Sequence, residues 1–130
     1  MPQLAQLFFK TAIVFLIVGI LMGLQMAISG NHAVIGAHAH ANLLGWVTMA
    51  IFGIYYALNP AKAATRLAMI HYGVYTLGVV VLIAALYAML MGNPQLEPLV
   101  AVASLVVFVA VLLFAVVLFS GEKARVAAAE

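Results

Sequence analysis

Four apolar runs, each long enough to cross a bilayer, dominate this sequence. They extend approximately over residues 7–29, 37–58, 67–91 and 99–119, and Lys10 is the one charged residue inside them. A hydrocarbon core of roughly 30 Å requires about 20 apolar residues in a helix. Backbone groups in lipid must be satisfied within the segment, and these runs lack the alternation of barrel strands. The sequence therefore predicts an all-α protein, an integral membrane four-helix bundle, with residues 1–130 forming a single transmembrane domain.

Composition excludes several classes of function. The chain is 68% hydrophobic and 6% charged, against about 45–50% and about 25% in soluble domains, so a water-soluble globule is excluded. Five Lys and Arg residues spread over 130 positions form no patch that could follow a phosphate backbone, so we expect no nucleic-acid partner. Cysteine is absent, which removes disulfides, thiolate zinc sites and iron–sulfur clusters.

The cations predict an orientation, because Lys and Arg are retained on the cytoplasmic side. In a bundle of four spans all five fall on one side: Lys10, Lys62, Arg66, Lys123 and Arg125. We therefore expect cytoplasmic amino and carboxyl termini, external connectors at 30–37 and 92–98, and a multi-pass protein of a bacterial-type inner membrane. The first run could instead be a signal peptide, but it exceeds the usual apolar length, and Gly19 and Gly23 form a small-xxx-small pattern typical of packed membrane helices.

Histidines mark the external start of the second predicted helix. His32, His38 and His40 cluster there, whereas the fourth histidine, His71, begins the third helix. Ionisable side chains near a span are costly and tend to face the protein interior or a site. His38 and His40 project about 200° apart on a regular helix, so they belong to different faces. The His38 face continues through small and polar residues suited to a bundle interior: Asn42, Gly45, Met49, Gly53 and Tyr56. The His40 face continues through residues suited to lipid or a second subunit: Leu44, Val47, Ile51 and Ile54.

A second polar stripe lies on the third helix. It starts at His71 and continues at helical spacing through Tyr75, Gly78, Leu82 and Ala85. His71 lies only about 6 Å from the cytoplasmic end at 1.5 Å per residue, so it occupies a separate layer from His38 and cannot share a metal ion with it. We interpret His71, and likewise His32, as hydrogen-bonded residues, and as a metal ligand His71 would belong to a site separate from that of His38 and His40. In the external layer, Gln25 and Asn42, with Tyr87 and Ser104 at nearby depths, are candidates to orient a ligand imidazole.

The run from His38 to Trp46 resembles the second helix of the catalytic subunit of the haem-copper oxidase and nitric oxide reductase superfamily. In that family a histidine near the external end of helix two is an axial ligand of the low-spin haem. A His-x-Asn form of the motif falls on His40 and Asn42, and a His-x-x-x-Asn form falls on His38 and Asn42. The face argument favours His38 and the resemblance favours His40, so both remain candidates. The family's larger subunits have many more helices, which supply the active-site and copper-binding histidines. Those are absent here, so oxygen or nitric oxide reduction by this chain alone is not expected.

The resemblance implies haem b on His38 or His40, for electron transfer or diatomic gas sensing, and the helix faces and depths given above place Asn42, Gly45 and Gln25 around it. A homo-oligomer would supply the second axial histidine from another copy at the same depth. Met22 or Met26 could fill that position instead, or it could stay open. The first alternative is copper or zinc on His32, His38 and His40, with external-side methionines such as Met89 and Met91 as thioether ligands for copper. The second alternative is a non-catalytic assembly subunit. The redox partner is left open.

Overall fold

The computed structural model describes residues 1–121 and is built from helices. Four helical segments are long and apolar enough to cross a membrane: Gln3–Ser29, Ile35–Leu58, Arg66–Leu90 and Pro94–Phe119. The described residues contain no strand. These bounds confirm the four predicted spans to within a few residues at most ends. Lys123 and Arg125, two of the five cations used to predict orientation, lie outside the described residues.

The second span is the one that departs from a regular α-helix. It consists of α2 (Ile35–His40), the π-helical segment η1 (Ala41–Thr48) and α3 (Met49–Leu58). Within η1 the Thr48 hydroxyl donates to the carbonyl of Leu43, five residues earlier, at 2.8 Å. A π-helical stretch changes the direction of the side chains that follow it. The regular helix assumed from the sequence is therefore wrong over eight residues.

The connections between spans are short and locally capped. α1 (Gln3–Ser29) ends at Gly30 in a left-handed conformation, with φ of 69°, which glycine adopts without steric cost. The short α4 (Pro60–Ala63) leads into α5 (Arg66–Leu90), and the Thr65 hydroxyl caps α5 by accepting from the Ala68 amide at 3.2 Å. The turn η2 (Pro94–Leu96) leads into α6 (Glu97–Phe119).

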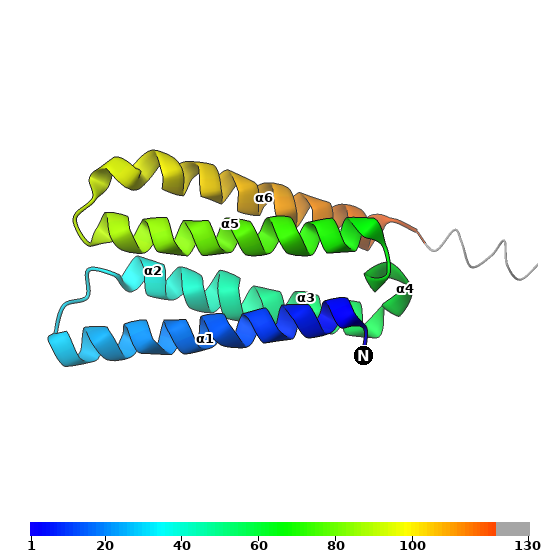
Figure 1. Ribbon diagram of the computed structural model, residues 1–130, viewed down its shortest axis with the longest axis horizontal. Helices are drawn as coiled ribbons and strands as arrows, with labels where there is room; N and C mark the ends of the chain where they lie inside the picture. The colour runs from blue at the N-terminus through cyan, green and yellow to red at the C-terminus, as the bar shows by residue number, and fades with distance from the viewer. Residues whose placement is uncertain (122–130) are drawn as a thin grey trace, which may run out of the picture.

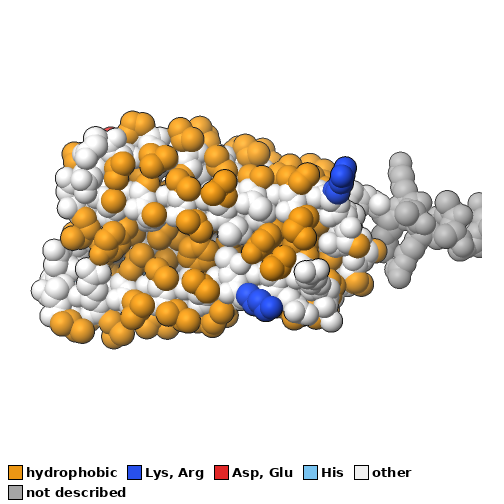
Figure 2. All heavy atoms as spheres, viewed as in Figure 1, with side chains coloured by type: hydrophobic (Ala, Val, Ile, Leu, Met, Phe, Trp, Pro, Cys, Tyr) orange, Lys and Arg blue, Asp and Glu red, His pale blue; other side chains and the backbone are white. Residues whose placement is uncertain are grey.

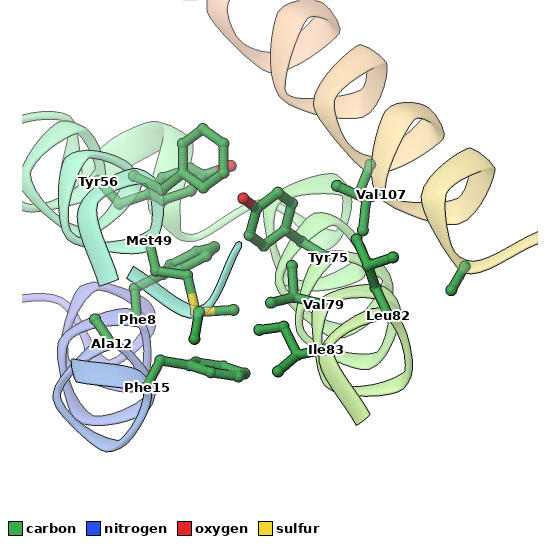
Figure 3. Packing of buried hydrophobic residues seen from close by; sticks show 14 of the residues in the cluster. Phe8, Ala12, Phe15, Met49, Tyr56, Tyr75, Val79, Leu82, Ile83 and Val107 are labelled. Carbon is green, nitrogen blue, oxygen red and sulfur yellow. The ribbon is translucent and has the colours of Figure 1, made fainter. Parts of the chain in front are cut away.

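The bundle is arranged as two antiparallel helix pairs that lie side by side (Figure 1). One pair is α1 with the α2–η1–α3 span, and the other is α5 with α6. Between the pairs lies a core in which Phe8, Met49 and Phe15 point towards Val79 and Ile83 of α5 (Figure 3). Apolar side chains also cover the outer surface (Figure 2). A bundle whose outer surface is apolar, like its core, is what a lipid environment requires.

Candidate functional site

His38 is held in the seam between α2 and α1. Its Nδ1 lies 2.8 Å from the backbone carbonyl oxygen of Gly19. A carbonyl oxygen only accepts, so Nδ1 carries the proton and Nε2 keeps its lone pair. The ring also lies against Gly23, where a Cβ atom would come within 3.2 Å of the imidazole Cε1. The neighbouring helix therefore fixes both the tautomer and the orientation of a half-buried histidine.

Glycines on both helices allow this seam to close. A Cβ atom on Gly19 would lie 2.6 Å from the amide nitrogen of Asn42, and one on Gly45 would lie 2.6 Å from the Cβ of Phe15. Asn42 itself donates from Nδ2 to the carbonyl oxygen of His38 at 2.9 Å. The two glycines of the small-xxx-small pattern on α1, Gly19 and Gly23, thus form the surface against which Asn42 and His38 pack. Beyond Asn42, the predicted interior stripe is also confirmed, because four of its members are buried: Gly45, Met49, Gly53 and Tyr56.

His40 is oriented by its own helix. Its Nδ1 donates to the carbonyl oxygen of Gly36 at 2.8 Å, which again leaves Nε2 with a free lone pair. His38 and His40 therefore have different partners, which agrees with their predicted placement on different faces of the helix. The predicted exposed stripe below His40 is only partly right. Val47, Ile51 and Ile54 are exposed, but Leu44 packs against the core and its carbonyl accepts from the Tyr75 hydroxyl at 3.1 Å. The π-helical segment places Leu44 on this inner side.

The polar residues expected around a ligand imidazole are placed differently. The side chain of Gln25 accepts from the Tyr87 hydroxyl at 3.1 Å, and Ser104 donates to Val100 on its own helix at 2.8 Å. No hydrogen bond within residues 1–121 joins Gln25, Tyr87 or Ser104 to a histidine ring. In one copy of the chain these three side chains have other partners, and their role around a ligand imidazole stays a prediction. Backbone carbonyls orient the rings of His38 and His40, and the sequence pattern of side chains carries no sign of such partners.

His71 lies deep in a separate aromatic layer. Its side chain is 0% exposed, and Nδ1 lies 3.0 Å from the hydroxyl of Tyr56. The rings of Phe8, Phe52 and Phe114 have centroids 5.4, 4.7 and 5.3 Å from the imidazole. Nε2 has no hydrogen-bond partner in the described chain. The interpretation of His71 as a hydrogen-bonded core residue is confirmed, but the partner Tyr56 was not anticipated.

The two histidine layers are well separated along the length of α1. His38 contacts α1 at Gly19, and His71 contacts the same helix at Phe8. Eleven residues of helix correspond to about 16 Å at 1.5 Å per residue. One metal ion cannot be ligated by both imidazoles, as the sequence predicted.

The other candidate ligands do not assemble around one point. His32 lies exposed in the connector, with Nδ1 3.2 Å from the carbonyl of Gly30. Met22 and Met26 are buried, whereas Met91 is exposed. Residues 1–121 contain no group of three or more His, Asp or Glu side chains that could hold a metal ion. A single copy therefore offers isolated imidazole nitrogens at the end of the bundle where α1 ends and α2 begins.

Comparison with protein-family models, with curated proteins and with solved structures found no match to this chain.

Proposed function

We propose that the chain is a membrane haem b protein that carries electrons or senses a diatomic gas, with histidine ligation near the external end of the bundle. The observation that supports this most is the 2.8 Å hydrogen bond from His38 Nδ1 to the Gly19 carbonyl. Metal-bound histidines characteristically donate their other ring nitrogen to a carbonyl or carboxylate, which fixes the ring and raises its basicity. When bound, haem would supply one-electron redox chemistry or an iron site for a gas.

His38 is the first candidate ligand and His40 is the second. Both present an Nε2 lone pair, and both are half-buried in the layer that would lie near the headgroups. The anchor of His38 comes from a neighbouring helix, whereas the anchor of His40 comes from its own helix. Tertiary packing therefore restricts the His38 ring more strongly, and a restricted ligand loses less entropy on binding.

The second axial ligand would come from a second copy of the chain. His38 and His40 face apart, and no further histidine within residues 1–121 joins either of them. A two-fold axis along the membrane normal brings the same residue of two copies to the same depth. The exposed apolar residues Val47, Ile51 and Ile54 continue the face of His40, so a contact between copies there would bring the two His40 rings together, whereas paired His38 rings would require a contact beside α1. This arrangement would give bis-histidine iron between subunits.

An absorption spectrum of protein purified from haem-replete cells in mild detergent tests the proposal. We expect a Soret band that is lost in His38→Ala or, if His40 is the ligand, in His40→Ala. His32→Ala is the matched control, because its ring lies exposed in the connector, and it should retain the band. Colourless protein would overturn the proposal. One equivalent of copper without iron would indicate the copper alternative, and metal-free protein would indicate an assembly subunit.

A further inference from the structure

Tyr56 is the one tyrosine whose hydroxyl pairs with a base within the described part of the chain. The sequence contains five tyrosines, and the Tyr56 hydroxyl lies 3.0 Å from Nδ1 of His71. An imidazole takes up a proton near neutral pH, whereas hydroxyl, amide and carbonyl oxygens do not. Three other tyrosines bond to such oxygens: Tyr72 to Thr11, Tyr75 to the Leu44 carbonyl and Tyr87 to Gln25. A proton released by Tyr56 therefore has an acceptor that can keep it.

The hydrogen bond runs from the Tyr56 hydroxyl to Nδ1 of His71. If Nδ1 donated instead, both the hydroxyl hydrogen and the Nε2 lone pair would lack a partner among residues 1–121. With the phenol as donor, only the Nε2 hydrogen lacks one, and unsatisfied buried groups are costly. The Phe52 ring lies 4.7 Å from the imidazole at 79°, and an N–H group against an aromatic face forms a weak hydrogen bond. The phenol proton thus already points at the nitrogen that can accept it.

Three phenylalanine rings surround the imidazole and would stabilise a positive charge on it. The centroids of Phe8, Phe52 and Phe114 lie 5.4, 4.7 and 5.3 Å from that of His71. Aromatic rings attract a cation within about 6 Å of their centroids. The one carboxylate side chain in residues 1–121, Glu97, begins α6 at the other end of the bundle. In the described chain the rings therefore take the place of a counterion for protonated His71.

Burial separates the path of the electron from the path of the proton. Tyr56 is 0% exposed, so an oxidant cannot touch its hydroxyl and remove a hydrogen atom directly. Its ring lies edge-on to the half-buried Tyr55, with centroids 5.6 Å apart. An electron can leave through Tyr55 to an oxidant outside the bundle, while the proton moves only from Tyr56 to His71.

We propose that Tyr56 and His71 form a proton-coupled redox site. An oxidised metal complex of high potential takes one electron from the Tyr56 phenol. The O–H bond of Tyr56 breaks and an N–H bond forms at Nδ1 of His71. The products are a neutral phenoxyl radical, an imidazolium and the metal complex reduced by one electron. Return of the electron reverses both transfers. This site does not depend on haem.

Photo-oxidation of the purified full chain in detergent, prepared without haem, tests the proposal. Tris(bipyridine)ruthenium with persulfate generates the oxidant, and electron paramagnetic resonance detects tyrosyl radicals. We expect Tyr56→Phe to remove most of the radical signal. Tyr75→Phe is the matched control and should keep it. Tyr75 is also 0% exposed, projects into the same core (Figure 3) and lies 5.9 Å from the His71 ring, but its hydroxyl bonds to a carbonyl.

His71→Gln separates a proton acceptor from a merely structural partner. The glutamine oxygen can accept from the Tyr56 hydroxyl but does not take up its proton. Radical formation, followed by transient absorption, should slow about 100-fold, the lower end of the effect of a positioned base. In the unaltered chain the same rate should fall in D₂O, because a proton moves with the electron.

Three results would overturn the proposal: an unchanged rate in His71→Gln, equal signal loss in Tyr56→Phe and Tyr75→Phe, or equal rates in H₂O and D₂O. If His71→Gln does not fold, the two tyrosine variants and the D₂O measurement decide. None of these readouts involves haem, so a colourless protein leaves this test valid.

Discussion

At the scale of single residues, the pair of Tyr56 and His71 shows how much a buried hydrogen bond constrains a membrane core. The Tyr56 hydroxyl is the sole partner of His71 within the described chain. We expect Tyr56→Phe to lower the free energy of unfolding by about 1–3 kcal/mol, because it leaves an imidazole buried with neither nitrogen bonded. The double variant Tyr56→Phe, His71→Phe should recover much of this loss, since replacing both partners by apolar groups can be nearly neutral. Unfolding in mixed detergent micelles measures both, and an additive loss in the double variant would contradict this account.

The same pair marks the limit of sequence interpretation for individual residues. Helical spacing correctly placed His71 on an interior stripe. The periodicity of apolar and polar residues can be found within a single helix, without knowing how the helices pack. It could not find Tyr56, since that contact joins two helices across the α4 connection. For the same reason the sequence identified His38 as an interior residue but not the Gly19 carbonyl as its partner. Every residue has a backbone carbonyl, and composition does not distinguish the one that will face a ring.

At the scale of elements, close packing of η1 on α1 depends on Gly45. A Cβ atom there would overlap the Phe15 side chain, including a contact of 2.6 Å with its Cβ, whereas nothing lies within 4 Å of the same position on Gly73. We expect Gly45→Ala to destabilise the bundle by about 1–3 kcal/mol through overpacking. Gly73→Ala is the matched control and should stabilise α5 by up to about 1 kcal/mol through helix propensity. Comparing the two variants by unfolding in mixed micelles checks this, and equal stabilities would be inconsistent with the tight contact.

The elements were also the most predictable part of the fold. Span length and apolar character follow from bilayer thickness, so all four spans could be located from the sequence alone. The π-helical segment could not, because it depends on tertiary partners such as the Tyr75 hydroxyl on the Leu44 carbonyl. The regular-helix assumption misplaced one residue: Leu44 was expected on the lipid face, but it is half-buried and packs against the core. Segments of this kind occur frequently near functional sites, and η1 begins directly after His40.

At the scale of the whole molecule, the position of the cations predicts the orientation in the membrane. Arg66 lies at the start of α5, and Lys62, also at that end, donates to the Leu118 carbonyl of α6 at 3.0 Å. Lys10 is exposed on the first span, towards the same end. Arg and Lys are retained on the cytoplasmic side, so we expect this end to be cytoplasmic and the His38 end to be external.

Cysteine labelling can test this orientation directly, because the natural sequence contains no cysteine. We expect a membrane-impermeant maleimide to label Asn31→Cys in intact cells, since Asn31 lies exposed in the connector between α1 and α2, which the cations predict to be external. Ala64→Cys, exposed at the opposite end, should react only after the membrane is permeabilised, and the unaltered chain controls for background. The reverse pattern would place His38 on the cytoplasmic side. The proposed haem site would then exchange electrons or ligands with the cytoplasm, so the topology determines which compartment this site serves.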